Sequence, residues 1–304
     1  MRAAVLRAFG QPLSVEDVPE PDVAEGQSLV EVKAAGINFA DVLISRGLYP
    51  QPPPLPTILG NEVAGDLGGR RVVAFTRASG GGYAERVAVD DGWVFDLPPG
   101  ASYAEGAAFL TTSLTAWIPL TRQARLHPGT NVLVTAAAGG VGTAAIQVAV
   151  FCGATVTAAA GSEEKLQLAR TLGAQRTVSY EEIGELDDID VALDPVGGPV
   201  FAACLKALRP LGIAIAIGFA GGAWEAVDPA RLVGRNVGVQ GFYLGRLLGF
   251  RPELVREEVH ELLALWRRGA IRPVVGAERP LEQANEALEL IGSRRSTGKV
   301  VLVP

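Results

Sequence analysis

A glycine-rich segment near the middle of the chain has the residue types needed to bind a phosphate group. Residues 132–142 read VLVTAAAGGVG, an apolar run that ends in glycines. Glycines let a pyrophosphate approach the backbone, and the first turn of a following helix offers free N–H groups and a positive dipole end. The segment follows the dinucleotide-binding pattern G-x-G-x-x-G with Ala137 in place of the first glycine. It predicts a dinucleotide site formed by Ala138, Gly139, Gly140, Val141 and Gly142.

The second predicted strand of this region, residues 155–160, ends without the acidic residue that usually holds the ribose 2′-hydroxyl of NAD. Gly161 and Ser162 follow the strand instead, and Lys165 stands one helical turn later. Tyr180 closes the third strand, from which it can reach the same place. A hydroxyl, an ammonium group and a phenol suit a 2′-phosphate. The pattern favours NADPH as the cofactor, although two glutamates in the same helical turn weigh against it.

Composition excludes several other kinds of chemistry. The 27 basic and 33 acidic residues give a net charge of −6, which is not the basic footprint of a nucleic-acid-binding protein. Two histidines and two cysteines in 304 residues cannot build a His-rich or four-cysteine zinc site. Cys152 and Cys204 are predicted to be buried, reduced thiols. The start of the chain has no signal-peptide pattern, and the apolar run at 132–160 is too interrupted to span a membrane, so we expect a cytoplasmic protein.

The elements around these residues change in character along the chain. Residues 1–120 read as short strands between Pro- and Gly-rich loops, typical of a β-barrel or sandwich, with strands at 1–6, 28–34, 71–75 and 84–89. Ser102 and Glu105 predict a capping box that opens a short helix. Beyond residue 130, strands alternate with helices, which predicts a parallel doubly wound sheet with strands at 131–136, 155–160, 176–180, 189–193, 212–218 and 236–243. Helices follow at 252–268 and 281–291. A final strand at 299–303 has no partner in that sheet, and we expect it to return to the N-terminal part.

Several separate motifs carry a family resemblance. They are AGINFAD at 35–41, RGLYP at 46–50, LGNEVAG at 59–65, LPPG at 97–100, AAAGGVG at 136–142 and GKVVL at 298–302. With these motifs in this order, the chain resembles the quinone oxidoreductase branch of the zinc-independent medium-chain dehydrogenases/reductases. The match covers essentially all of the chain.

The resemblance implies an α/β fold with two domains. Residues 1–118 and 247–304 would form a GroES-like, β-rich catalytic domain, and residues 119–246 a Rossmann domain with its doubly wound parallel sheet. The cleft between them would hold the nicotinamide. A homodimer joined through the edge of the cofactor sheet is also implied.

The resemblance also bears on metal. Zinc-dependent relatives have cysteine or histidine at the positions that match Asn38 and Asn61 and near Thr111, and this chain has neither residue type there. We therefore expect no metal site. Without a Lewis acid the acceptor must take hydride readily, as quinones and activated enones do.

The family's site residues map onto the motifs. Asn38 would contact the cofactor ribose or the substrate oxygen, Tyr49 would line the substrate pocket and relay a proton, and Asp41 would fix the loop. The alternative is that Asn38 and Asp41 only cap a turn and that Tyr49 only packs. Asp194 is as well explained by turn capping as by cofactor contact. The remaining cofactor-binding candidates are Thr115, Gly218, Phe219, Phe242 and Lys299.

The expected activity is NADPH-dependent reduction of a small-molecule quinone by hydride transfer. Two alternatives stay open: reduction of the C=C bond of α,β-unsaturated carbonyl compounds, and a non-catalytic NADPH-binding role. No nucleic-acid or membrane partner is expected.

Overall fold

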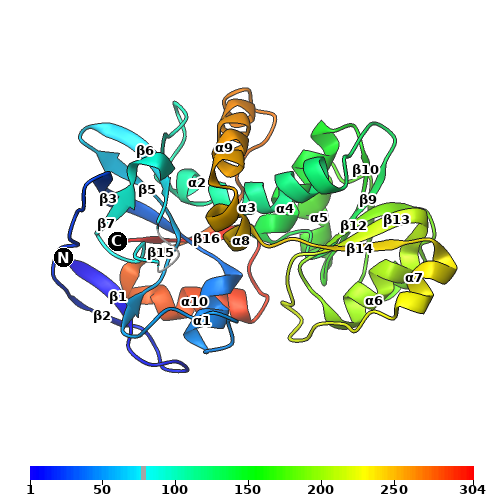
Figure 1. Cartoon of the computed structure of the whole chain (residues 1–304), viewed down its shortest axis with the longest axis horizontal. Coiled ribbons are helices and arrows are strands. Elements are labelled where there is room, and N and C mark those ends of the chain that lie inside the picture. Colours follow the sequence, from blue (N-terminus) through cyan, green and yellow to red (C-terminus); the bar gives the residue numbers. More distant parts are fainter. Residues whose placement is uncertain (77–79) are drawn as a thin grey trace. The chain divides into compact units, whose positions relative to one another are not determined.

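The protein is described by a computed structural model that places residues 1–76 and 80–304. The chain forms two compact units (Figure 1). The first unit comprises Met1–Thr111 with Pro273–Pro304, and the second comprises Thr112–Arg272. The sequence predicts domain boundaries at 118/119 and 246/247, whereas the compact units meet at 111/112 and 272/273. The predicted boundaries concern the catalytic and dinucleotide-binding domains and stay a prediction.

The first unit is rich in β-structure. A seven-stranded sheet has the order β15-β16-β3-β5-β6-β8, with β7 paired to β3, and a three-stranded sheet has the order β2-β1-β4. The strands are β1 (Arg2–Leu6), β2 (Ser14–Asp17), β3 (Gln27–Ile37), β4 (Thr57–Ile58), β5 (Glu62–Leu67), β6 (Arg70–Phe75), β7 (Arg86–Asp90), β8 (Val94–Asp96), β15 (Val275–Pro280) and β16 (Lys299–Val303).

The last strand of the chain joins this sheet, as the sequence predicted. β16 runs antiparallel to β3, with Val301 opposite Gly36, and parallel to β15. Gly36 is required by a close approach, because a Cβ there would lie 2.1 Å from the carbonyl oxygen of Ala107 and 2.8 Å from Cγ of Glu62. The C-terminal strand β16 is therefore part of the same sheet as β3 from the N-terminal part of the chain.

Three helices accompany these strands: α1 (Phe39–Ser45), α2 (Tyr103–Ala107) and α10 (Ala284–Gly292). The predicted capping box is confirmed at α2, where Ser102 Oγ accepts from the N–H of Glu105 at 3.1 Å and Glu105 Oε2 accepts from the N–H of Ser102 at 2.7 Å. The helix predicted at 281–291 begins as a 3₁₀ turn, Leu281–Gln283, before α10.

The second unit is a Rossmann fold. Its six parallel strands have the order β11-β10-β9-β12-β13-β14, which is the 3-2-1-4-5-6 order of a doubly wound dinucleotide-binding sheet. The strands are β9 (Asn131–Val134), β10 (Thr155–Ala159), β11 (Arg176–Val178), β12 (Ile189–Asp194), β13 (Leu208–Ala216) and β14 (Gly238–Gly241). The predicted parallel sheet is confirmed.

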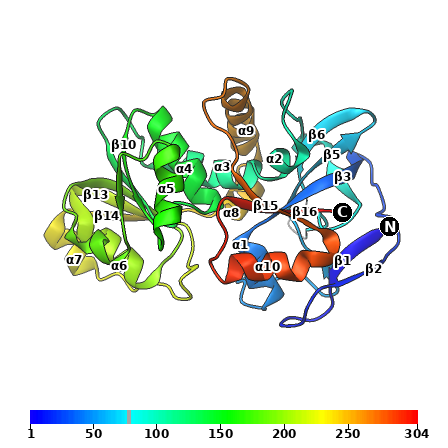
Figure 2. The ribbon, with the colours of Figure 1, turned by 180° about the vertical axis from the view of Figure 1, so that it is seen from behind.

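Helices cover both faces of this sheet. α4 (Gly140–Phe151) and α5 (Glu163–Thr171) lie on one face, and α6 (Gly198–Ala207) and α7 (Pro229–Arg235) lie on the other (Figures 1 and 2). Because both faces are covered, the central strands β9 and β12 are largely apolar and buried. Leu133, Ala159 and Ile189 are buried in one apolar cluster with Phe201 and Leu208.

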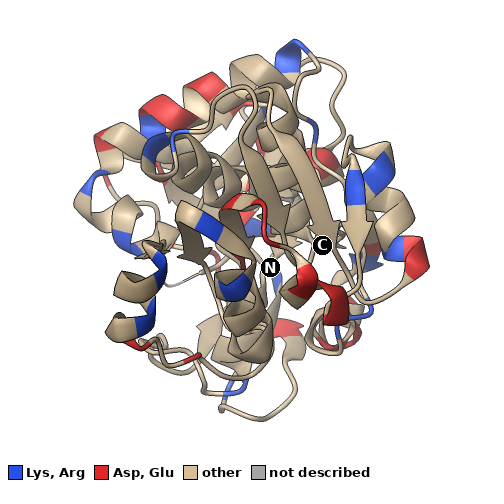
Figure 3. Ribbon diagram, turned by 90° about the vertical axis from the view of Figure 1, so that its right-hand side faces the viewer, with Lys and Arg blue, Asp and Glu red and all other residues tan. Residues whose placement is uncertain are grey.

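The second unit also contains most of α3 (Leu110–Ile118), which begins at the end of the first unit. It further contains α8 (Leu244–Phe250) and α9 (Pro252–Arg267), the last close to the helix predicted at 252–268. Within the described ranges, none of the helices has the length and apolar character needed to cross a bilayer. Basic and acidic residues are interspersed along the helices and loops (Figure 3), as expected from the nearly balanced composition.

Candidate functional site

The glycine-rich turn has the strand–turn–helix geometry that the sequence predicted. β9 ends at Val134, Gly139 is the N-cap of α4, and the helix begins at Gly140. The N–H groups of residues 140–142 belong to the first helical turn, so they have no partner within the helix and can donate to a phosphate. The left-handed residue of the turn is Ala136, with φ of 46°, and not Ala137, which takes the place of the first glycine in the motif.

Two glycines in this turn have different roles. A Cβ on Gly142 would lie 2.3 Å from the carbonyl oxygen of Ala136 and 2.7 Å from Cα of Ala137, so only glycine lets the helix pack against the turn. A Cβ on Gly139 would meet only the Ala136 oxygen, at 3.2 Å. The backbone is therefore open at Gly139, which fits the approach of a pyrophosphate.

The ends of β10 and β11 bring the predicted 2′-phosphate residues together. The strands are paired up to Ala159 and Val178, so the residues that follow them share one edge of the sheet. Ser162 is the N-cap of α5, and its Oγ accepts from the N–H of Lys165 at 3.4 Å. The Tyr180 ring lies beside Gly161, 3.7 Å from where a Cβ of that glycine would be.

The two glutamates that weighed against NADPH begin α5. Glu163 accepts a hydrogen bond from Arg170 at 2.5 Å, and that ion pair offsets part of the negative charge at this helix N-terminus. Glu164 lies in the same first turn of α5, where the positive end of the helix dipole stabilises acidic side chains.

The other cofactor candidates of the second unit follow strands or lie in a buried helix. Gly218 and Phe219 come after β13, where the Phe219 ring packs 4.8 Å from Trp224, centroid to centroid. Phe242 follows β14 and is held by its N–H to the carbonyl of Ala216 at 3.0 Å. Thr115 is buried in α3. Their contact with a cofactor remains a prediction.

Asp194 caps a turn. Its side chain is fully buried, and it accepts from the Thr135 hydroxyl and from the N–H groups of Val196 and Gly197. Burial raises the pKa of Asp194, and these three hydrogen bonds partly offset that shift. These contacts favour the turn-capping interpretation.

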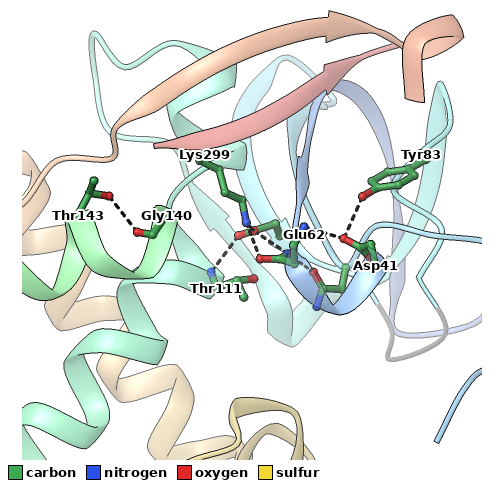
Figure 4. A network of polar contacts seen from close by, with 9 residues as sticks. Asp41, Glu62, Tyr83, Thr111, Gly140, Thr143 and Lys299 are labelled. Carbon is green, nitrogen blue, oxygen red and sulfur yellow. Dashed lines mark hydrogen bonds and ion pairs between the residues drawn. The ribbon is translucent and has the colours of Figure 1, made fainter. Parts of the chain in front are cut away.

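The first unit contains a buried polar network centred on Glu62 and Lys299 (Figure 4). The Lys299 Nζ donates to Glu62 Oε1 at 2.5 Å, and the side chains are 4% and 1% exposed. The other oxygen, Glu62 Oε2, accepts from the N–H of Thr111 at 2.9 Å. The pair is therefore compensated in charge and fixed by a backbone bond.

Asn38 joins this pair to the start of α1. Its Oδ1 accepts from Lys299 at 2.5 Å, and its Nδ2 donates to Asn61 Oδ1 at 2.8 Å and to Glu62 Oε1 at 3.0 Å. Both N–H bonds of the amide are thus used inside the unit. Asn38 is also the N-cap of α1, and its backbone N–H donates to Asp41 at 2.7 Å.

Asp41 lies at the buried end of the network. Its Oδ2 accepts from the Tyr83 hydroxyl at 2.9 Å, and the Tyr83 side chain is fully buried (Figure 4). Burial raises the pKa of Asp41 to about 6, because both hydrogen-bond donors are neutral and Lys299 only partly compensates. Burial also raises the pKa of Tyr83 well above its ordinary value.

The structure thus brings Asn38, Asp41 and Lys299 together, three of the predicted residues. Tyr49 follows the left-handed Gly47 in a loop, half-buried, and its role remains a prediction. Sequence reasoning missed Glu62 and Tyr83 as members of the site. The available signal for Glu62 was an acidic residue directly before the apolar residues Val63 and Ala64, within the LGNEVAG motif. Among residues 1–76 and 80–304, no three His, Cys, Asp or Glu side chains are grouped so as to hold a metal ion.

Comparisons with known proteins agree with both units. Residues 24–69 match the family described as alcohol dehydrogenase GroES-like domain, and residues 140–266 match the family described as zinc-binding dehydrogenase. The chain is 36% identical over 324 residues to quinone oxidoreductase-like protein 2 of Rattus norvegicus, covering 99% of the chain and 91% of the relative.

Two solved structures extend the similarity to three dimensions. The quinone oxidoreductase from Thermus thermophilus, also solved as a complex with NADPH, has a TM-score of 0.92 and 40% identity over 100% of both chains. A mycobacterial protein complexed with NADPH has a TM-score of 0.92 and 29% identity, again over 100% of both chains.

Proposed function

Because the chain belongs to the quinone oxidoreductase family of the medium-chain dehydrogenases/reductases, we propose that it is an NADPH-dependent oxidoreductase that reduces quinones without zinc. The observation that carries the cofactor part is the glycine-rich turn beside a strand end with no acidic residue. Similar proteins solved as NADPH complexes support the same cofactor.

The residues present fit NADPH. The N–H groups at 140–142 would hold the pyrophosphate, and Gly139 leaves the backbone open to it. The Ser162 hydroxyl, the Lys165 ammonium and the Tyr180 phenol would hold the 2′-phosphate. When bound, NADPH supplies the hydride.

The Glu62–Lys299 pair supports a reaction without zinc. Zinc-dependent relatives have thiol or imidazole ligands at two positions that match Asn38 and Asn61 and at a third near Thr111. In this chain these residues have amide side chains at Asn38 and Asn61 and a hydroxyl at Thr111. The Lys299 ammonium lies 2.5 Å from Asn38 Oδ1, so a metal cation near that oxygen would meet a like charge.

The proposed roles in catalysis follow from these contacts. Asn38 orients the groups around it, Asp41 fixes the start of α1 through the Asn38 N–H, and Tyr49 lines the substrate pocket. The quinone oxygen that gains the electron pair takes its proton from water, since a quinone product is protonated on oxygen and needs no obligatory side-chain acid.

The proposal is tested by measuring NADPH oxidation with and without added quinone. The oxidation is monitored as the loss of NADPH absorbance. The assay runs on chelator-treated protein, against a panel of small quinones and α,β-unsaturated ketones. We expect acceptor-dependent oxidation that survives chelation and is fastest with a quinone. A faster reaction with the enones would identify an enone reductase. NADPH binding without turnover of any acceptor would indicate a non-catalytic role.

We further propose a homodimer joined through the exposed edge of the cofactor sheet, and a cytoplasmic location. The dimer is supported by exposed apolar residues beside β14. The location is supported by the thiols of Cys152 and Cys204, which are both free, as is typical of reducing compartments.

A further inference from the structure

The orientation of two amide side chains in the first unit is determined by Lys299. An ammonium group can only donate, so the Asn38 atom that it contacts at 2.5 Å must be the carbonyl oxygen Oδ1. The Asn38 Nδ2 then points to Asn61, and the atom of Asn61 that it contacts at 2.8 Å must be an acceptor, Oδ1. Lys299 thereby fixes which end of the Asn61 amide faces away from the network.

The outward end of Asn61 is its Nδ2, which carries two N–H donors. Within the described part of the chain, the Asn61 side chain has one hydrogen bond, the one that it accepts from Asn38, and the residue is half-buried. A second group without a hydrogen-bond partner belongs to Thr111, which contacts the Glu62 carboxylate. Thr111 donates its backbone N–H to Glu62 Oε2, whereas its Oγ1 is buried and has no hydrogen-bond partner among the described residues.

A buried hydroxyl without a partner is uncommon in native proteins and often marks a bound water or ligand. The Asn38 Nδ2 contacts both Asn61 Oδ1, at 2.8 Å, and Glu62 Oε1, at 3.0 Å, so the Asn61 amide lies near that carboxylate oxygen. Thr111 contacts the other oxygen, Glu62 Oε2, through its backbone N–H. Because the Asn61 amide and the Thr111 hydroxyl are both neutral and both can donate, the ligand atom that suits them is an uncharged oxygen acceptor that becomes more negative during the reaction.

We propose that Asn61 Nδ2 and Thr111 Oγ1 bind the carbonyl oxygen of the hydride acceptor, with Lys299 and Asn38 as the positioning residues that point the Asn61 donors at it. The inference rests on the proposed function. It assigns the substrate contact to Asn61, since Asn38 has already used both of its N–H donors. It also explains why a zinc-free member can stabilise the developing oxyanion.

Asn61→Asp is the decisive variant. An aspartate keeps an oxygen that accepts from Asn38 and replaces the outward N–H pair by a carboxylate oxygen, which repels the oxyanion. We expect kcat/KM for 1,4-naphthoquinone to fall about a hundredfold, the usual effect of losing one oxyanion donor. The NADPH dissociation constant is expected to stay within about threefold. Gln11→Glu, the same amide-to-carboxylate change on an exposed loop, is the matched control.

A vibrational measurement separates this inference from the proposed function. Naphthoquinone labelled with ¹³C at its carbonyls is bound to the protein saturated with NADP⁺, so that no turnover is needed. Hydrogen bonding from Asn61 and Thr111 lowers the carbonyl stretching frequency in the wild type and in Gln11→Glu. The lowering is lost in Asn61→Asp and reduced in Thr111→Val, which keeps the backbone bond to Glu62 and guards against misfolding of the first variant.

The outcomes are distinct. A wild type that lowers the carbonyl frequency but does not oxidise NADPH would contradict the proposed function and leave the carbonyl contact standing. An equal lowering in the wild type and both variants, or a kcat/KM within threefold of the wild type in Asn61→Asp, would overturn the inference. A tenfold loss of NADPH affinity in Asn61→Asp would assign the amide to the cofactor instead, and a quinone that does not bind would overturn both proposals.

Discussion

The two buried carboxyl groups of the first unit differ in their partners. Glu62 has an ammonium group at 2.5 Å, whereas the hydrogen bonds to Asp41 come from a backbone N–H and a phenol. Neutral donors only partly replace the hydration that a carboxylate loses on burial, which is why the pKa of Asp41 is raised to about 6. The two residues therefore call for different tests of stability.

Asp41 is expected to make the protein less stable as the pH rises. Its folded pKa of about 6 lies above the ordinary value of 3.8, so the folded state holds the proton more tightly than the unfolded state. The contribution is fully present below about pH 4 and is lost as the pH rises through 6, by on the order of 3 kcal/mol. In urea unfolding at several pH values, Asp41→Asn should gain stability relative to the wild type between pH 4 and 7. A stability difference that does not change with pH would contradict this assignment.

Lys299→Met tests the charge compensation of Glu62. The variant leaves a buried carboxylate without its ammonium partner, which typically costs about 3–5 kcal/mol. The double variant Lys299→Met/Glu62→Gln removes both charges and should recover most of that loss in urea unfolding. Lys33→Met, which breaks an exposed pair with Glu31, should change stability by about 1 kcal/mol or less. A double variant no more stable than Lys299→Met would show that the pair is not the source of the effect.

The residues of this network show what the sequence could and could not predict. Asn38, Asp41 and Lys299 lie in recognisable motifs, so each could be assigned to a site. Their contacts could not be predicted, because Lys299 meets Glu62 across 237 positions and Tyr83 meets Asp41 across 42. Hydrophobic periodicity contains no information on such distant pairs, which depend on the closure of the whole sheet.

At the scale of elements, burial on both faces made the parallel strands easy to predict. β9 and β10 are uncharged, largely apolar runs, and β12 has the apolar stretch Val191–Leu193 between its two aspartates. All six strands of that sheet were expected. β5 and α1 were missed for physical reasons. β5 has the sequence EVAGDL, which contains two acids and a glycine, and α1 has only seven residues. Helices that short depend on tertiary contacts and not on their own propensity.

The close packing of α4 against its turn can be tested with Gly142→Ala. The added Cβ would meet backbone atoms of Ala136 and Ala137 at 2.3–2.8 Å, so the turn must move away from the helix start. We expect NADPH affinity to fall at least tenfold and the melting temperature to drop. Gly234→Ala in α7, where a Cβ meets nothing within 4 Å, should leave both unchanged or raise stability slightly. Equal NADPH affinity in both variants would show that this turn does not hold the pyrophosphate.

We expect the residues at the end of β10 to determine the choice between NADPH and NADH. Lys165→Glu turns an attraction for the 2′-phosphate into a repulsion, while the ribose hydroxyl of NADH is uncharged. Dissociation constants measured by fluorescence titration should therefore rise about a hundredfold for NADPH and only slightly for NADH, which corresponds to about 3 kcal/mol of lost discrimination. An equal loss for both cofactors would contradict the assignment of Ser162, Lys165 and Tyr180.

At the scale of the whole molecule, the Rossmann sheet ends in an edge that is suited to pairing. β14 is the last strand of the six, and an edge strand presents unpaired backbone groups. Leu211 and Val233 are 88% and 77% exposed beside it, and the N–H of Leu211 donates to the carbonyl of Asn236, just before β14. The side-chain oxygen of Gln240, in β14 itself, is buried without a hydrogen-bond donor among the described residues.

These features predict a symmetric dimer in which β14 of one protomer lies against β14 of its partner. Sedimentation equilibrium should give the wild type a mass near twice 31.7 kDa. The double variant Leu211→Glu/Val233→Glu places two charges in the apolar patch and should sediment as a monomer. Val23→Glu, the same substitution at a 47% exposed valine of the first unit, should remain a dimer. A monomeric wild type, or a double variant that stays dimeric, would show that this edge does not join the protomers.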